Sequence, residues 1–390
     1  MKPFERIAAA LVVLATLAVL SGCGSNAATG AGENRAQAAT ATAAKRFSER
    51  GPYPVGVATL KLSDRSVEVY YPARKGSTAG LPSETYLQTD PIPQGMLAML
   101  PKIPAGVDLT VTIPATRDAP AAADGPFPLI IFSHGAGGWR SGYGSVLSGI
   151  ASWGFVIAST DYVEYGFVSQ FSRAPSGNLT QRRASVATAV GATLDLMSTQ
   201  TREASGRFSG VIDLNKIGAI GHSAGGGTMF GELNDPRIRT IVGWAPVPPP
   251  TPVASHTPTL IIAGENDSAI SPATIATEYD SLQTPKRLVV IANLGHNAFS
   301  DSCLAIRGGN DLVGLAKQLG MGIPQGLLDL ARNGCTQEDL DTQKGWSIIQ
   351  HFTVAELRTG LGIDARPRGL GPASAHAFPG VALSYREQLK

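Results

Sequence analysis

The residues best suited to chemistry lie at 221–225, where the sequence GHSAG places Ser223 between two glycines. The apolar run Lys216–Gly221 before the serine is typical of a buried strand, and Ala224–Leu233 after it is typical of a helix. A serine on such a sharp strand-to-helix turn has an exposed hydroxyl, and the helix N-terminus behind it favours developing negative charge. The pattern in this position predicts that Ser223 is a nucleophile.

A serine hydroxyl reacts only when a base removes its proton, and histidine is the usual base. Four of the six histidines follow this serine along the chain. His296 comes directly after the apolar run Arg287–Ala292, so it is expected at the carboxyl end of a strand, and we predict that it is the base. His256 instead precedes an expected strand, while His351 falls in an expected helix and His376 in the C-terminal segment.

An acid that orients the histidine should follow an earlier strand of the same sheet. The apolar run Thr259–Ala263 is followed by Gly-Glu-Asn-Asp, and a helix is expected next over Ser271–Leu282. We predict that Asp267 is the acid, with Glu265 as the alternative. Its carboxylate would hold the histidine tautomer and stabilise the imidazolium that forms on proton transfer.

Acyl transfer also requires N–H donors aimed at the oxyanion that develops on the substrate. The first expected donor is the backbone N–H of Ala224, directly after the nucleophile. The second is expected in the loop His134-Gly135-Ala136, which follows the buried run Pro128–Ser133. We predict the N–H of Ala136, with Gly135 as the alternative, and interpret His134 as a structural hydrogen-bonding residue.

Two tryptophans stand beside these loops in the sequence. Trp139 follows the oxyanion segment, and Trp244 ends an expected central strand over Ile238–Trp244. Each is expected either to line a pocket for an acyl group or aromatic ring, or to pack in the core. The sequence contains no cluster of metal ligands, no phosphate-binding loop and no dinucleotide-binding fingerprint, so we expect no metal and no cofactor.

Buried apolar runs alternate with helical patterns along the chain, which predicts a mostly parallel sheet with helices on both faces. The predicted fold class is therefore α/β. The net charge of +2, from 32 basic and 30 acidic residues, gives no electrostatic footprint for nucleic acid. Further strands are expected over Val55–Leu62, Val67–Tyr71 and Gly154–Thr160, and further helices over Tyr143–Ser152, Thr180–Met197 and Trp346–Thr359.

The N-terminus has the pattern of an export signal. Charged residues precede the apolar run Ile7–Leu20, which is too short to span a bilayer but matches the hydrophobic region of a signal peptide. The sequence LSGC at 20–23 resembles the lipobox of bacterial lipoproteins. We therefore predict a signal peptide over 1–22 and a lipid on Cys23, with an ordinary signal and an incidental cysteine as the alternative. The lipid would anchor the exported protein to a bacterial cell membrane, facing away from the cytoplasm.

The rest of the chain divides into a tether, a catalytic domain and a tail. Residues 23–48 are rich in small and polar residues and are predicted to form a flexible tether. The catalytic domain is expected over 49–363, with insertions at about 73–124 and 301–340 near the active site. Pro, Gly and Ala dominate 364–390, so we expect this tail to be poorly packed.

Cys303 and Cys335 are the two cysteines that remain after Cys23. In an exported protein such a pair is most simply a disulfide, with two buried free thiols as the alternative. The bond would enclose two apolar helical patches, Leu312–Met321 and Gln325–Ala331, and would pin a small cap near the predicted base.

Four segments combine the strand, oxyanion-loop and nucleophile patterns: GPYPVGV at 51–57, FSHGAGG at 132–138, GFVIA at 154–158 and IGAIGHS at 217–223. Together they resemble the platelet-activating-factor acetylhydrolase and chlorophyllase-like group, and also dienelactone-hydrolase-like proteins. The resemblance covers most of 51–296 and implies a serine esterase with the α/β-hydrolase fold. In that family the residue after the His-Gly pair and the residue after the nucleophile supply the oxyanion N–H groups, which correspond here to Ala136 and Ala224.

Two segments, GHSAGGG at 221–227 and LIIAGEND at 260–267, also resemble bacterial cutinase-type polyester hydrolases. Those enzymes lack a His-Gly pair in the oxyanion loop and have an open site. This chain departs from them in both respects, because it has the pair and carries two insertions.

These features predict a serine-dependent carboxylic-ester hydrolase that acts through a Ser-His-Asp triad and an acyl-enzyme. The expected partners are a small-molecule, lipid or polymer ester and, through the lipid anchor, a membrane. The alternative enzymes are a cutinase-like polyester hydrolase, an acyltransferase and an amide hydrolase. The alternative outside enzymes is a binding lipoprotein that keeps the fold without the chemistry.

Overall fold

The computed structural model describes residues 45–167, 169 and 179–390. The predicted signal peptide, the lipidation site Cys23 and most of the predicted tether lie outside these residues. The folded part begins inside the predicted tether, because Phe47 is buried and packs edge-on against Trp153, with ring centroids 4.9 Å apart. Within the described residues, no helix combines the length and the apolar composition that crossing a bilayer requires.

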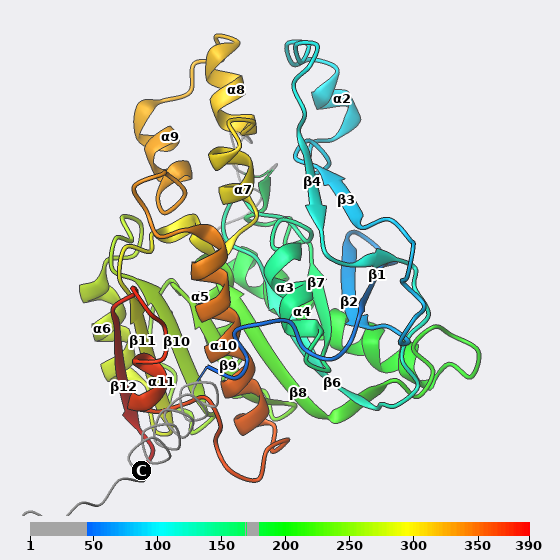
Figure 1. The fold of residues 1–390 in the computed structure, drawn as a ribbon, viewed down its shortest axis with the longest axis vertical. Coiled ribbons are helices and arrows are strands. Elements are labelled where there is room, and N and C mark those ends of the chain that lie inside the picture. Colours follow the sequence, from blue (N-terminus) through cyan, green and yellow to red (C-terminus); the bar gives the residue numbers. More distant parts are fainter. Residues whose placement is uncertain (1–44, 168, 170–178) are drawn as a thin grey trace, which may run out of the picture. The chain divides into compact units, whose positions relative to one another are not determined.

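Ten strands form one sheet in the described part of the chain (Figure 1). Six parallel strands make up its centre, and antiparallel pairings extend it at both edges. The prediction of an α/β fold with a mostly parallel sheet is confirmed. From one edge to the other, the strands are β12 (Leu383–Gln388), β11 (Lys286–Ile291), β10 (Thr259–Gly264), β9 (Ile238–Trp244), β8 (Ile212–His222), β6 (Phe127–Ser133), β7 (Val156–Thr160), β2 (Ser66–Pro72), β1 (Val55–Lys61) and β5 (Thr116–Arg117).

Helices cover both faces of this sheet and define two apolar cores. Strand β6 shows why the central strands are apolar along their whole length. Ile130 and Phe132 point into one core, whereas Leu129 and Ile131 point into the other, so every position is buried. The first core includes residues of α3 (Gly144–Ala151) and α10 (Thr342–Gly360), and the second includes residues of α4 (Leu179–Arg202), α5 (Ala224–Gly231) and α6 (Pro272–Ser281).

Both predicted insertions extend beyond the carboxyl ends of the parallel strands (Figure 1). The first contains the antiparallel pair β3 (Glu84–Leu87) and β4 (Thr110–Ile113), with α2 (Gln94–Leu97) between them, and it ends in β5. The second contains α7 (Ser302–Arg307), α8 (Leu312–Gln318) and α9 (Gln325–Arg332). The predicted disulfide between Cys303 and Cys335 is confirmed and encloses these three helices.

The prediction of a poorly packed tail at 364–390 is wrong. This segment forms α11 (Pro372–Ala375) and then β12, which pairs antiparallel with β11 along its whole length. The alternation Leu383-Ser384-Tyr385 carries a strand signal, but it is short and lies among Pro and Gly. Because β11 offers a free edge, backbone pairing decides the conformation here where local composition predicts none.

Candidate active site

Ser223 lies on the turn between β8 and α5. Its backbone has φ +53° and ψ −118°, which side chains other than glycine rarely adopt, and its N–H donates to the Trp244 carbonyl oxygen over 2.9 Å. The turn is tight because a Cβ on Gly221 would lie 2.2 Å from the Gly225 carbonyl oxygen. The strained turn directs the serine side chain away from the strand and into the cavity described below.

His296 begins the short 3-10 helix η2 (His296–Phe299), which follows β11. Its ring Nε2 is 2.9 Å from Ser223 Oγ, and its Nδ1 is 2.8 Å from Asp267 Oδ2. An ionised carboxylate only accepts hydrogen bonds, so Nδ1 carries the proton and Nε2 accepts from the serine hydroxyl. The structure thus brings the three predicted residues into one hydrogen-bonded row.

Two of the three other downstream histidines, His351 and His256, have hydrogen bonds away from this row. His351 on α10 is buried, where its Nδ1 accepts from the Phe47 N–H and its Nε2–H donates to the Gly369 carbonyl oxygen. The exposed His256 donates from Nδ1–H to the Thr284 carbonyl oxygen. Both side chains therefore have structural bonds that account for them.

Asp267 follows β10, and its carboxylate is fully shielded from solvent. While Oδ2 faces the histidine, Oδ1 accepts from the N–H groups of Ala269 (2.8 Å) and Ile270 (2.7 Å). These three bonds fix the orientation of the carboxylate. The alternative acid, Glu265, is exposed and makes no side-chain hydrogen bond within the described residues.

The loop after β6 places Ala136 at the cavity with its residue exposed. The N–H of the alternative donor Gly135 is already engaged, because it donates to the Tyr143 hydroxyl over 3.1 Å. His134 is buried at the base of the loop, where its Nδ1–H donates to the Gly135 carbonyl oxygen and its Nε2 accepts from the Tyr162 N–H. These bonds match the structural role expected of His134, and burial lowers its pKa below the usual value.

A hydrogen-bonded chain that the sequence does not predict runs behind the nucleophile. His222 donates from Nε2–H to the His296 carbonyl oxygen (2.9 Å), so its Nδ1 accepts from the Tyr143 hydroxyl (2.7 Å). The same hydroxyl accepts from Gly135. Burial and the neighbouring His296 lower the pKa of His222 well below its usual value, which keeps this ring neutral. The chain links the oxyanion loop to the backbone of the predicted base.

A cavity of about 180 Å³ opens beside Ser223 and His296. Both insertions form its walls, through Tyr86 on β3 and Leu312 on α8, for example. Among the described lining residues there is no Lys or Arg. The full lining is Tyr86, Gln88, Pro91, Val111, Ala136, Gly137, Gly138, Trp139, Gly142, Tyr143, Phe167, His222, Ser223, His296, Asn297, Ser300, Asp301, Ser302, Ala305 and Leu312.

The two tryptophans have different positions. Trp139 lines the cavity and packs edge-on against Tyr86, with ring centroids 5.0 Å apart. Trp244 does not reach the cavity, so its assignment as a pocket residue is wrong. It is fully buried, contacts Phe299 and donates its indole N–H to the Thr353 hydroxyl over 3.0 Å. The alternative of ordinary core packing therefore holds for Trp244, because its strand position points its side chain toward α10.

Asp301 is a buried carboxyl in the cavity wall that the sequence analysis missed. It accepts from the Ser145 N–H at 3.2 Å, at the start of α3, and from the Tyr86 hydroxyl at 3.3 Å. Burial raises its pKa to about 7. No group of three or more metal-binding side chains occurs among the described residues.

Asn333 is a second residue that the sequence analysis missed, and it lies beside the predicted acid and base. Its side-chain oxygen accepts from the N–H of His296 over 2.7 Å. An Asn in a polar segment far along the chain has no local pattern that marks it. The nearest feature visible in the sequence is Cys335, which follows Asn333 by two positions.

Two family models match overlapping parts of the chain. One is described as PET hydrolase-like and matches residues 134–312. The other is platelet-activating factor acetylhydrolase, isoform II, and matches residues 39–182. The first match contains Ser223, Asp267 and His296, and the second contains the oxyanion loop.

Two curated relatives are platelet-activating factor acetylhydrolases. That of Cavia porcellus is 25% identical over 298 residues, which covers 65% of this chain and 68% of the relative. That of Canis lupus familiaris is 29% identical over 140 residues, covering 33% of this chain and 32% of the relative. A solved ferulic acid esterase from Streptomyces cinnamoneus shares the fold, with a TM-score of 0.56 at 20% identity over 85% of this chain and 96% of that one.

Proposed function

We propose that this chain cleaves carboxylic esters through an acyl-enzyme on Ser223. The chain is an ester-hydrolysing enzyme with the α/β-hydrolase fold, and the proposal concerns its mechanism. The observation that carries the proposal is the unbroken hydrogen-bonded row of Asp267, His296 and Ser223 at the cavity. A serine, a base and an orienting acid at these distances are what nucleophilic acyl transfer requires.

In the first step, Ser223 Oγ attacks the ester carbonyl carbon while His296 Nε2 takes the hydroxyl proton. The tetrahedral intermediate then expels the alcohol, which receives that proton from His296. In the second step, a water molecule attacks the acyl-enzyme with His296 again as the base, and the acid leaves with Ser223 restored. The buried Asp267 carboxylate stabilises the imidazolium that exists between these transfers.

The backbone N–H groups of Ala136 and Ala224 are the proposed oxyanion donors. Ala224 is the first residue of α5, and within the described residues neither N–H has a protein acceptor. Gly135 is excluded as a donor because its N–H bonds to Tyr143. Losing one such donor typically removes about 2.7–4 kcal/mol of transition-state stabilisation.

The volume and the lining of the cavity favour a substrate with a compact, uncharged acyl group. An engineered protein cavity of about 150 Å³ holds a benzene molecule, so about 180 Å³ accommodates one aromatic ring or a short aliphatic chain. Trp139 and Tyr86 supply aromatic surface for such a group. The names of the similar proteins specify an acetyl ester, whose acyl group is small, and ferulic acid, whose acyl group carries one aromatic ring.

A polyester is the second candidate substrate, because the PET hydrolase-like model matches the region that contains the row. Tyr86 and Leu312, from the two insertions, both line the cavity, so a polymer strand would have to fit between the insertions to reach Ser223. We therefore place soluble esters first.

We also propose that the chain is an exported lipoprotein anchored through Cys23. The apolar run before LSGC supports this, and so does the disulfide, since disulfides persist mainly outside reducing compartments. Metabolic labelling with a radioactive fatty acid tests it: the label should be lost in Cys23→Ser, and a parent protein without label would contradict the anchor.

The decisive test of the chemistry is Ser223→Ala. We expect kcat for a p-nitrophenyl ester to fall by at least about 10³-fold, and labelling by a fluorophosphonate to disappear, while the melting temperature stays that of the parent. A variant with near-parental activity would contradict the proposal. A panel of p-nitrophenyl esters of increasing acyl length, an aryl-acid ester and a polyester film then identifies the acyl group, and an added alcohol acceptor reveals any acyl transfer.

A further inference from the structure

We propose that Asn333 is a positioning residue that holds the predicted acid and base at their working distance. The proposal rests on the proposed function, because it concerns the row that ends at Ser223. Asp267 and His296 come from different loops, one after β10 and one after β11, so something must fix the distance between these loops. Asn333 belongs to neither loop and contacts both.

All the polar groups of the Asn333 carboxamide point at these two loops. Its Oδ1 accepts from the N–H of His296 (2.7 Å) and the N–H of Ser268 (3.0 Å). Its Nδ2–H donates to the Asn266 carbonyl oxygen (2.9 Å). The reverse orientation would face the amide nitrogen with two N–H donors, so the hydrogen-bonding partners fix the orientation of the carboxamide.

The residues that Asn333 contacts are the ones that decide where the acid and base stand. Asn266 and Ser268 flank Asp267 on its two sides, and the third contact is the N–H of His296 itself. Apart from this bridge, the described residues of these segments share the Asp267–His296 bond and two backbone bonds. One runs from the Asn266 N–H to the Leu294 carbonyl oxygen (3.0 Å), and the other from the Glu265 N–H to the Ile291 carbonyl oxygen at the end of β11 (2.9 Å). The Asn333 side chain thus adds three bonds where few others exist.

The backbone around Asn333 fits the histidine loop closely. Its carbonyl oxygen accepts from the Asn297 N–H over 2.9 Å. Gly334, with φ +89°, lies directly against Gly295, because a Cβ on Gly295 would fall 2.4 Å from the Gly334 nitrogen. Two glycines in this contact allow the loops to meet backbone to backbone, which leaves Asn333 little freedom to shift.

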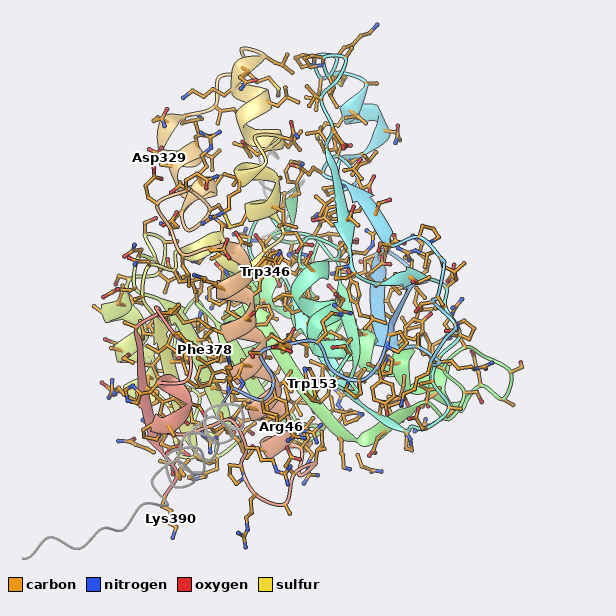
Figure 2. The ribbon with its side chains drawn as sticks, viewed as in Figure 1. Arg46, Trp153, Asp329, Trp346, Phe378 and Lys390 are labelled. Atoms are coloured by element: carbon orange, nitrogen blue, oxygen red, sulfur yellow. A yellow bond between two sulfur atoms is a disulfide. The ribbon has the colours of Figure 1, made fainter. Side chains whose placement is uncertain are left out.

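The disulfide anchors this contact. Cys335 follows Asn333 by two positions, and its partner Cys303 lies just after η2, so the bond ties both ends of the second insertion to the histidine loop. On another side of this loop, Trp346 of α10, which is labelled in Figure 2, contributes a hydrogen bond. Its indole N–H donates to the Ala298 carbonyl oxygen over 2.8 Å. The insertion therefore has a role in catalysis besides lining the cavity, because it supplies Asn333, whose hydrogen bonds form a clamp between the loops of the acid and the base.

The test uses the full-length protein and three substitutions. Asn333→Ala removes all three side-chain bonds. Asn333→Asp keeps the acceptor for the two N–H groups, loses the donor to Asn266 and adds a negative charge. Asn310→Ala is the matched control, because it lies in the same disulfide loop with an exposed side chain that makes no hydrogen bond within the described residues.

We expect Asn333→Ala to lower kcat by about 10–100-fold with KM within about twofold, since displacing a reacting group by about 1 Å has effects of this size. Asn310→Ala should behave as the parent. In Asn333→Asp the acid limb of the kcat/KM profile should move to higher pH, because a carboxylate beside the histidine favours its protonated form, whereas in Asn333→Ala the limb should stay in place. This difference in pH dependence checks that position 333 lies beside His296, whereas the fall in kcat at a nearly unchanged KM in Asn333→Ala is the result that a purely structural asparagine would not produce.

Counting active sites by fluorophosphonate titration makes kcat independent of any loss of folded protein. Parental kcat per titrated site in Asn333→Ala, or a parental pH profile in Asn333→Asp, would overturn the proposal. Ser223→Ala is measured in the same series. If Ser223→Ala kept its activity, the proposed function itself would fail, and that result is distinct from a failure of the clamp.

Discussion

The two halves of the candidate site are held in different ways. The nucleophile half, which comprises Ser223 and the oxyanion loop 134–138, sits on the adjacent central strands β8 and β6 and is positioned by direct backbone contact. A Cβ on Gly225 would lie 2.1 Å from the Ser133 carbonyl oxygen. The acid–base half, which comprises Asp267 and His296, sits on the loops after β10 and β11. These loops have a close backbone contact of their own, between Gly264 and Leu294, and the second insertion holds them in addition from outside.

This difference separates what the common sheet supplies from what the insertion supplies. The nucleophile half is positioned mainly by its own strands and their glycines, and the Tyr143 hydroxyl and His222 give the oxyanion loop further support. The acid–base half depends on a segment that is far away in sequence and is closed by a disulfide. A change in the insertion is therefore expected to act first on the acid–base half, where its direct contacts lie.

The largest effect is expected from Gly225→Ala in the nucleophile half. The new methyl would collide with backbone atoms of β6 and its loop, which are not flexible side chains, so the start of α5 would have to move away from β6. We expect a loss of more than about 4 kcal/mol in the free energy of unfolding, seen as failure to recover folded protein or as a large fall in melting temperature.

The matched control is Gly231→Ala at the other end of the same helix. Nothing lies within 4 Å of a Cβ at that position, so we expect a gain of about 0.4–1 kcal/mol or no change. If Gly225→Ala were as stable as Gly231→Ala, the half would not be held by backbone contact and the comparison would fail.

The disulfide provides the next effect, and it should fall on the acid–base half. Replacing Cys303 and Cys335 together by Ser opens a loop with a sequence separation of 32 residues, which the chain-entropy treatment equates with about 3–4 kcal/mol of stability in urea unfolding. Hydrogen exchange should show faster exchange over 293–340. Strands β6 and β8 should keep the protection that they have in the oxidised parent.

Equal loss of protection in β6 and β8 would mean that the two halves open together, against the comparison. Parental exchange over 293–340 would mean that the bond does not hold the acid–base half. The oxidised parent, handled without reductant, is the reference in both measurements.

The sequence predicted the nucleophile half more completely than the acid–base half. The pattern GHSAG, the His-Gly pair and the buried strand before each are local, and each local pattern corresponds to one turn in the structure. Asp267 and His296 were also predictable, because each directly follows an apolar strand. Their roles in catalysis remain predictions.

The contacts that hold these residues were not predictable from local patterns. Asn333 lies 37 positions from His296, and Tyr143 lies 79 positions from His222, so no spacing rule connects them. For Trp244 the sequence suggested a contact that the structure lacks. Its position at the end of a strand suggested a pocket residue, but the strand directs its side chain into the core. In the tail, the free edge of β11 determines β12, and composition alone could not reveal that edge.

Asp301 lies where the two halves meet. Its backbone N–H donates to the Gly142 carbonyl oxygen over 2.9 Å, and its carboxyl accepts from Ser145 at the start of α3 and from Tyr86 of the first insertion. The titratable groups that interact with it are tyrosines, and within the described residues it has no ion pair with Lys or Arg. Burial without a cation raises its pKa to about 7.

The smallest expected effect is therefore a pH dependence of the free energy of unfolding that arises from Asp301. The folded state holds the Asp301 proton up to about pH 7, whereas the unfolded state releases it near pH 4, so its contribution to stability is present at low pH and is lost as the pH rises through 7. Between pH 6 and 8 the free energy of unfolding should fall by about 1.4 kcal/mol for this reason. Asp301→Asn mimics the protonated carboxyl, so the same measurement on this variant should lack that fall. Every other titrating group is common to both proteins, so the difference between their urea unfolding curves at the two pH values isolates the contribution of Asp301. If the free energy of unfolding changed with pH to the same extent in both proteins, Asp301 would not hold a buried proton.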